Sequence, residues 1–161
     1  MKPAICTALA TLALAGCAAI TPTQVSQSEP AREAKMAFDV TSGNPVVVNL
    51  TLATIDMTRK QLLEQGITPK IVVTFRGDAS YFTQDTLSVV KEDQRADALA
   101  VKAKIRELKL AKGVEGFEQC NVPLASRKLK GTDLMTEVKL VPNGWIALAN
   151  YQQQGYAYIV P

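Results

Sequence analysis

The sequence contains no histidine, and this absence removes whole classes of chemistry. Without an imidazole the chain cannot build a Ser-His-Asp or Cys-His catalytic arrangement, a histidine-rich zinc site or a histidine pH switch. The sequence also lacks a C-x-x-C pair, a G-x-x-x-x-G-K-[ST] phosphate loop, a G-x-G-x-x-G turn and a G-x-S-x-G nucleophile elbow. It therefore predicts no intramolecular dithiol cycle, no metal site and no cofactor.

The chain also has little excess of charge of either sign. The 161 residues include 18 lysines and arginines against 15 aspartates and glutamates, so the formal net charge is +3. Nucleic-acid-binding domains usually concentrate basic residues on one face, and we expect no nucleic-acid partner here. Apolar residues make up 47% of the chain, which is enough for the core of one ordinary domain.

The first residues have the pattern of a targeting segment. Lys2 gives a short positive start, residues 4–15 are small and apolar, and the run ends in L-A-G-C at Cys17, which resembles a bacterial lipobox. We expect a signal peptide over residues 1–16 and a lipid on Cys17 that anchors the protein to a membrane. Because Ala18 rather than aspartate follows, the pattern favours the bacterial outer membrane, facing the periplasm. The alternative is an ordinary secretory signal with a chance cysteine.

After the lipobox, the chain divides into two regions that differ in composition and in hydrophobic periodicity. Residues 17–34 are rich in Thr, Gln, Ser, Pro and Ala without hydrophobic periodicity, which indicates a flexible tether. From residue 35 strand and helix patterns alternate as far as residue 161. The predicted strands cover residues 35–41, 70–75, 114–119, 136–141 and 156–160, and the predicted helices cover 46–65, 96–112, 121–129 and 143–154. This order predicts a single α/β domain with a mainly parallel five-stranded sheet and helices on both faces.

Two of the predicted helices rest on different signals. Residues 46–65 begin with a β-branched run typical of a strand, but twenty residues without glycine or proline favour one long helix, with Asn44 as its cap and Pro45 at its first position. Residues 96–112 are plainly amphipathic, with Val101 on the apolar face and Lys102 expected to lie away from it.

In parallel α/β sheets, reactive and ligand-binding groups gather just beyond the carboxyl ends of the strands. Two predicted loops meet that condition: Arg76 and Gly77 follow one strand, and Cys120 and Asn121 follow the next. We expect backbone N–H groups of the helix after Cys120 to favour its thiolate, and Arg76 to add positive charge that could grip an anionic sulfur compound.

A second interpretation of Cys120 stays open. Free cysteine is among the most buried residue types and often packs as a small apolar side chain. Cys6 leaves with the predicted signal peptide and Cys17 is consumed by lipid, so Cys120 is expected to be the one free thiol of the mature chain. It is therefore either the reactive group of the protein or a part of its core.

The closing segments V-P-N-G-W-I-A (residues 141–147) and Q-G-Y-A-Y-I-V-P (residues 154–161) resemble the end of DsrE/DsrF-like proteins. The C-N step at Cys120 and the strand and loop at residues 70–77 resemble that family more weakly. The resemblance covers residues 35–161 and implies a compact α/β domain that commonly forms a homotrimer or homohexamer. It also implies that Cys120 accepts sulfane sulfur as a persulfide, with Asn121, Arg76 and Gly77 as neighbours that could bind the substrate. Arg76 stands where many relatives have histidine, so no role of that histidine is inherited.

These observations lead to one main hypothesis and two rivals. The main one is a lipid-anchored, periplasm-facing sulfur carrier that works with a sulfur donor or acceptor protein. The rivals are a non-catalytic binding or assembly module of the cell envelope with Cys120 buried, and a redox sensor in which Cys120 forms a mixed or intersubunit disulfide. If the protein is an enzyme at all, the sequence supports no activity beyond sulfur transfer as a persulfide carrier.

Overall fold

The computed structural model describes residues 32–161 as one α/β domain. The predicted signal peptide, Cys17 and the predicted tether up to residue 31 lie outside the described residues. The strands are β1 (Glu33–Val40), β2 (Thr68–Phe75), β3 (Val114–Cys120), β4 (Val138–Val141) and β5 (Ala157–Ile159). The helices are α1 (Pro45–Glu64), α2 (Arg95–Lys109), α3 (Val122–Ser126) and α4 (Gly144–Gln153), with 3-10 turns η1 (Gly77–Thr83), η2 (Glu92–Gln94) and η3 (Gly131–Asp133). None of the helices in this part of the chain combines the length and the apolar character needed to cross a bilayer.

The five strands form one sheet in the order β4-β3-β2-β1-β5, and every pair of neighbours is parallel. The predicted fold class is therefore confirmed. β1 and β2 lie inside the sheet, and β2 contributes an almost continuous buried run, as expected for a strand covered on both faces. β1 begins at Glu33, two residues before the predicted start, because Glu33 continues the ladder by pairing with Thr68.

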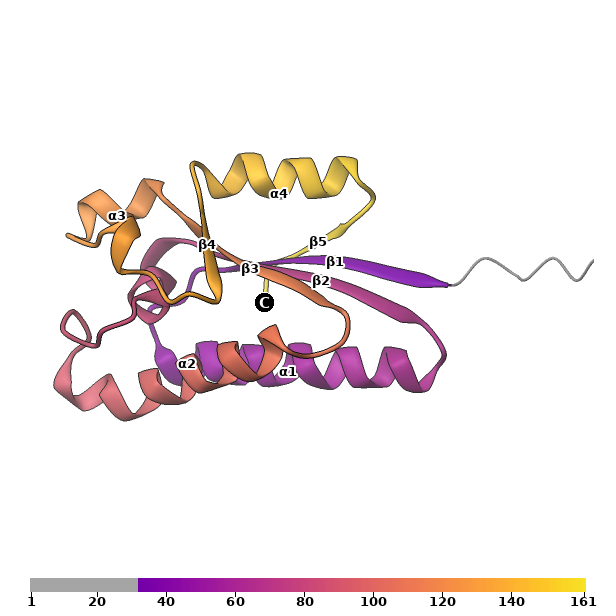
Figure 1. The fold of residues 1–161 in the computed structure, drawn as a ribbon, viewed down its shortest axis with the longest axis horizontal. Helices are drawn as coiled ribbons and strands as arrows, with labels where there is room; N and C mark the ends of the chain where they lie inside the picture. Colours follow the sequence, from indigo (N-terminus) through magenta and orange to yellow (C-terminus); the bar gives the residue numbers. More distant parts are fainter. Residues whose placement is uncertain (1–31) are drawn as a thin grey trace, which may run out of the picture.

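The direction of the connections decides which helix covers which face. From β1 through β3 the chain steps in one direction across the sheet, and the right-handed crossover rule places α1 and α2 on the same face. From β4 to β5 it returns in the opposite direction, so α4 lies on the other face. Figure 1 shows this arrangement, with α1 and α2 below the sheet, α4 above it, and α3 at the end where β3 finishes.

The long helix α1 confirms the choice of helix over strand for residues 46–65. Asn44 caps it, with its side-chain oxygen accepting the N–H of Val46 at 3.0 Å, and Pro45 occupies the first turn. Its apolar positions Val48, Leu52 and Ile55 recur at helical spacing and are buried against the sheet. Burial of this stripe outweighs the weak helix propensity of the β-branched residues.

The two faces of the sheet differ in how much core they carry. The larger core lies beneath α1 and α2 and includes Phe75, Phe117 and the predicted Val101. The core beneath α4 is small and consists of Ala37, Val72, Leu148 and Tyr156, with Tyr151 packed against it. Within residues 32–161, the ten-residue helix α4 alone covers this second face, which leaves room there for polar side chains near the ends of the strands.

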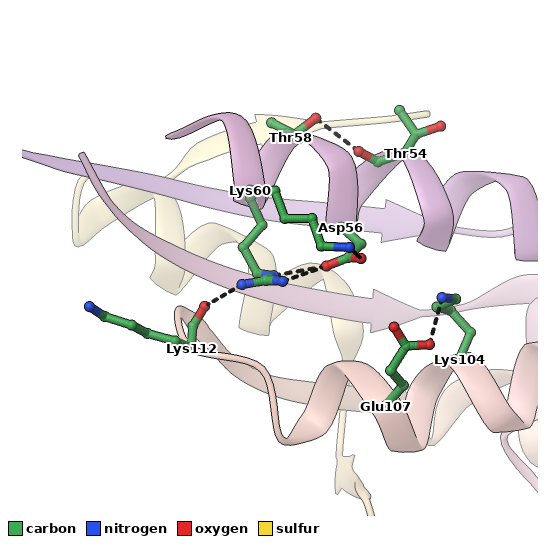
Figure 2. Close-up of polar contacts among 8 residues, drawn as sticks. Thr54, Asp56, Thr58, Lys60, Lys104, Glu107 and Lys112 are labelled. Carbon is green, nitrogen blue, oxygen red and sulfur yellow. Dashed lines mark hydrogen bonds and ion pairs between the residues drawn. The ribbon is translucent and has the colours of Figure 1, made fainter. Parts of the chain in front are cut away.

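A buried ion pair ties α1 to the turn that precedes β3. Arg59 donates from Nε and Nη2 to one carboxylate oxygen of Asp56 at 2.9 and 2.7 Å, and from Nη1 to the carbonyl of Lys112 at 3.2 Å. Figure 2 shows Lys60 on the same carboxylate. Burial raises the pKa of Asp56, but the hydrogen bonds from Lys60 and Arg59 outweigh it and hold that pKa below its usual value.

Two details of the predicted helices are corrected. The helix expected over residues 121–129 is only the five-residue α3, because the chain turns at Arg127 and Lys128, where Lys128 adopts a positive φ of 55°. Lys102, expected to lie away from the core, is buried, since its ammonium reaches back to donate to the carbonyl of Asp85. Burial lowers the pKa of Lys102.

Candidate functional site

Cys120 is the last residue of β3 and the only free cysteine within residues 32–161. Side chains alternate along a strand, and Phe117 belongs to the core under α1 and α2, so Cys120 faces the side of the sheet that α4 covers. The residue is 3% exposed. Its sulfur accepts a hydrogen bond from the backbone N–H of Gly144 at 3.1 Å.

This hydrogen bond places the positive end of a helix against the thiol. Gly144 is the first residue of α4, and Asn143 caps that helix by accepting the N–H of Trp145 at 3.0 Å. An N–H donor and the positive end of a helix dipole both stabilise negative charge that develops on the atom that they face. The expectation of helical N–H groups near Cys120 is met by α4 and not by α3, the helix that directly follows the cysteine.

Gly144 is required by space as much as by its N–H group. A Cβ atom on this residue would lie 2.6 Å from Cδ and 2.9 Å from Cγ of Arg76, and 3.0 Å from Cβ of Cys120. The absence of a side chain therefore lets α4 start directly against both residues. The sequence signal for this role is a glycine at the start of a helix, directly after a proline and a capping asparagine.

Arg76 follows β2 and is held by a carboxylate on the neighbouring strand. Its Nε donates to Oδ1 of Asp39 at 2.8 Å, and its Nη2 donates to Oδ2 of the same residue. Asp39 is 2% exposed and also accepts the hydroxyl of Tyr158, from β5, at 2.7 Å. The hydrogen bond to Asp39 raises the pKa of Arg76 and that of Tyr158. Neither Asp39 nor Tyr158 was singled out from the sequence as part of the site.

Trp145 covers the guanidinium of Arg76 from the outside. The centre of the guanidinium lies 5.2 Å from the centroid of the indole ring, within the range of a cation–π contact. Trp145 as a whole is 67% exposed. Arg76 is therefore fixed by Asp39 at its edge and by Trp145 on its face, which leaves it little freedom to swing toward a ligand.

A cavity of about 260 Å³ opens over the thiol. Arg76, Gly77 and Cys120 line it together, α3 contributes Val122 and Pro123, and Trp145 stands at its edge. Gly77 has a φ of +53°, and a Cβ there would approach the carbonyl oxygen of Thr41 to 3.2 Å, so the turn after β2 depends on glycine. The cavity gives a small molecule a route to a sulfur that has almost no surface of its own.

A second arginine in the cavity wall is also paired. Arg127 donates from Nε to Oδ1 of Asp78 at 2.8 Å, and its Nη2 lies 2.7 Å from the same oxygen. Each guanidinium that borders the cavity thus has a carboxylate partner outside it. The site presents arginine side chains without a large excess of positive charge.

The predicted site residues divide into two groups. Cys120, Arg76 and Gly77 meet at the cavity, as parallel strand ends require. Asn121 is exposed, is not among the residues that line the cavity, and donates its backbone N–H to the carbonyl of Val141 at 2.9 Å. Within residues 32–161, no three His, Cys, Asp or Glu side chains lie close enough together to hold a metal ion.

The arrangement suits an exchange reaction at sulfur. The cysteine is held by a backbone donor, is shielded from bulk water and is reached through a cavity that admits only small groups. A disulfide on a folded partner could not approach a side chain this buried without movement of α3 or Trp145. A small sulfur compound, or a slender thiol, could enter as the structure stands.

Comparisons with known proteins agree with the fold. The sequence model of the DsrE/DsrF-like family matches residues 35–161. A protein from Aquifex aeolicus (strain VF5), described as uncharacterized, is 26% identical over 125 residues; the match covers 78% of this chain and 55% of that protein, so the chain spans about half the length of its relative. The solved structure of a protein of unknown function from Methanobacterium thermoautotrophicum superposes with a TM-score of 0.57 at 19% identity, covering 81% of this chain and 99% of the other.

Proposed function

The chain belongs to the DsrE/DsrF-like family, which is associated in general with sulfur relay, and on that premise we propose that Cys120 accepts a sulfane sulfur atom and carries it as a persulfide. The observation that carries the proposal is the placement of Cys120. A free thiol ends a parallel strand, receives the N–H of Gly144 and forms part of a cavity wall. A cysteine with only a packing role would need neither the donor nor the cavity.

The reaction is a two-electron transfer between sulfur atoms. The Cys120 thiolate attacks the outer sulfur of a hydropersulfide, R–S–SH, and a new S–S bond forms as the donor's S–S bond breaks. The transferred sulfur keeps its proton, R–S⁻ leaves, and the product is Cys120–S–SH. Attack by an acceptor thiolate on the outer sulfur repeats the exchange and returns the Cys120 thiolate. No external oxidant or reductant is needed.

The charges around the cavity favour one kind of donor. Arg76 is balanced by Asp39 and Arg127 by Asp78, so a dianion such as thiosulfate would enter without an unpaired cation to meet it. A small alkyl hydropersulfide carries at most one charge. Its alkyl group could lie against Val122 and Pro123. We therefore propose low-charge hydropersulfides, with thiosulfate as the weaker donor.

Mass spectrometry of the intact protein tests this proposal. After incubation with an alkyl hydropersulfide, wild-type residues 32–161, in which Cys120 is the one thiol, are expected to gain the mass of one sulfur atom, and the gain should be removed by dithiothreitol. Cys120→Ser, which keeps a small hydrogen-bonding group at the site, should gain none. A wild-type protein that stays unlabelled, or a Cys120→Ser variant labelled to the same extent, would refute the carrier.

The burial of Cys120 supports a second candidate, a binding or assembly module in which this cysteine only packs. With 3% of the residue exposed, Cys120 resembles many core cysteines. Alkylation separates the two functions. A carrier should react with iodoacetamide in its native state at neutral pH, through the cavity, whereas a packing cysteine should react only after denaturant is added.

The lipid anchor on Cys17, the outer-membrane location and the homo-oligomer stay predictions. Incorporation of labelled palmitate into the full chain, lost in Cys17→Ala, checks the anchor, and membrane fractionation checks its location. Sedimentation of residues 32–161 checks the oligomer. A monomeric carrier in the soluble fraction would contradict all three expectations while leaving the chemistry at Cys120 intact.

A further inference from the structure

A buried polar cluster lies behind Cys120, on the other face of β3, and the sulfur chemistry proposed above does not use it. The cluster consists of Gln119, Ser80 and Thr83, each of which is 0% exposed. Because side chains alternate along a strand, Gln119 points into the core beneath α1 and α2, while Cys120 points toward α4. Ser80 and Thr83 belong to η1, the turn that begins with Gly77 at the wall of the thiol cavity.

The side-chain amide of Gln119 joins this turn to the cysteine. Its Nε2 donates one proton to Oγ of Ser80 at 2.7 Å and the other to the backbone carbonyl of Cys120, also at 2.7 Å. Its Oε1 accepts the hydroxyl of Thr83 at 2.8 Å. One hydrogen bond therefore ends on Cys120 itself, and the other two hold the amide in place against η1.

The carbonyl of Cys120 receives this bond at the point where the neighbouring strand has ended. β2 stops at Phe75, which is opposite Gln119, so Cys120 extends one residue past it. The N–H of the same peptide group belongs to Asn121 and donates to the carbonyl of Val141 at 2.9 Å. The peptide group after Cys120 is thus held at its oxygen by a side chain and at its nitrogen by the sheet.

This fixed peptide group leaves the thiol little freedom. β3 holds the backbone before Cys120, so rotation about the Cα–Cβ bond is the main movement left to the sulfur, and the N–H of Gly144 at 3.1 Å selects one position of that rotation. The same peptide group leads into α3, whose Val122 and Pro123 line the cavity. Its orientation therefore sets the place of the sulfur and the position of that wall.

Filling the core does not require an amide at this place. Burial of polar side chains costs solvation free energy, and apolar groups of the same shape are often close to neutral as replacements for a buried hydrogen-bonded pair. Phe82 and Phe117 are examples of the apolar side chains that fill the rest of this core. We propose, on the premise of the sulfur-carrier function above, that Gln119 is a positioning residue. Through the carbonyl of Cys120 it keeps the sulfur on the N–H of Gly144 and open to the cavity.

Gln119→Met tests the proposal, because methionine has nearly the same length but lacks the amide. The rate of sulfur transfer to Cys120 at saturating alkyl hydropersulfide is expected to fall about ten-fold, the effect of losing one buried hydrogen bond, while the donor concentration at half-maximal rate should change less than about two-fold. In nuclear magnetic resonance spectra the amide-proton signal of Gly144 should move toward that of an unbonded N–H. An unchanged Gly144 signal would overturn the proposal even if no sulfur were transferred, so the result is separate from that of the carrier function.

Thr83→Val is the matched control. It removes a hydrogen bond of the same cluster and keeps the shape of the side chain, but it leaves both donor contacts of Gln119 in place. It should destabilise the protein to urea without changing the transfer rate or the Gly144 signal.

Gln119→Asn is the milder second change, which keeps the test open where the methionine variant fails to fold. Its amide is one methylene too short to reach Ser80 and the carbonyl of Cys120 together, and it should slow transfer in the same way. Equal slowing in Thr83→Val, or a wild-type rate in a folded Gln119 variant, would refute the positioning role and leave a cluster that only stabilises the core.

Discussion

Gly144→Ala is expected to lower the free energy of unfolding by about 3 kcal/mol, the upper end of the cost of overpacking a tight core. The same change is expected to slow sulfur transfer to Cys120 about ten-fold, the cost of a weakened hydrogen bond at the reacting atom. This result would be unusual, because alanine normally favours a helix more than glycine does. The expected loss comes from the space around residue 144.

The added methyl group would meet two residues that cannot easily move. It would lie 2.6 Å from Cδ of Arg76, whose guanidinium is fixed by Asp39, and 3.0 Å from Cβ of Cys120, which is anchored in β3. The remaining way to relieve the contact is for the start of α4 to retreat. That movement would lengthen the 3.1 Å hydrogen bond from Gly144 to the sulfur.

Urea denaturation and the rate of persulfide formation measure the two effects. Gly116→Ala is the matched control, because a Cβ at Gly116, on the same strand as Cys120, meets no atom within 4 Å. It should be neutral or slightly stabilising. The double variant Gly144→Ala with Arg76→Ala should cost less than the sum of the two single changes, since removing Arg76 relieves the closest contacts. Additive costs, or a Gly144→Ala protein as stable and as reactive as wild type, would show that this space is not limiting.

The order of elements was predictable because each element carries its own signal. Asn44 and Pro45 mark the start of α1, the apolar run of β2 indicates a covered strand, and glycines follow the ends of α1 and α4. These signals act over a few residues and give the strand and helix pattern, from which the parallel sheet follows. Predicting the position of Cys120 at the end of a strand required no more than this.

The partners of the site residues were not predictable in the same way, because they are distant in sequence. The donor to Cys120 is 24 residues away, the carboxylate of Arg76 is 37 residues away, and the hydroxyl of Tyr158 reaches Asp39 over 119 residues. The order and the register of the strands decide these contacts. The alternation of strands and helices along the sequence determines neither of them. The placement of Arg76 near Cys120 was predicted, but the compensation of its charge by Asp39 was not.

That compensation changes the expected role of Arg76. A free guanidinium would attract anionic donors, whereas one bound edge-on by a buried carboxylate and covered by Trp145 mainly shapes the cavity. The pair also joins β2 to β1, and Tyr158 extends it to β5, so one carboxylate connects three adjacent strands at their carboxyl ends. Asp39 is therefore the residue whose removal should affect stability and donor preference together.

Asp39→Ala is expected to lower the free energy of unfolding by about 4 kcal/mol, the cost of leaving one partner of a buried pair uncompensated. The guanidinium of Arg76 would lose both of its hydrogen bonds to the buried carboxylate of Asp39, and the hydroxyl of Tyr158 would lose its acceptor. Asp39→Asn keeps the shape but removes the charge, and should cost about half as much. Asp78→Ala, which breaks the ion pair with Arg127, provides the control. The side chain of Asp78 is 57% exposed, so its removal leaves no buried charge uncompensated at position 78 and should cost less than about 1 kcal/mol.

The chemistry of Asp39→Asn should change in the opposite direction from its stability. With its counter-charge removed, Arg76 would present a net positive charge beside the cavity, which attracts anions. Labelling by thiosulfate should therefore become faster than in the wild-type protein, with the gain shrinking as salt is added, while labelling by an uncharged hydropersulfide should change less. Mass spectrometry of samples quenched at a series of times, at low and at high ionic strength, measures the labelling rate for each donor. If thiosulfate labels Asp39→Asn no faster than wild type at low salt, then the charge balance around Arg76 does not set donor preference, and the size of the cavity must account for it instead.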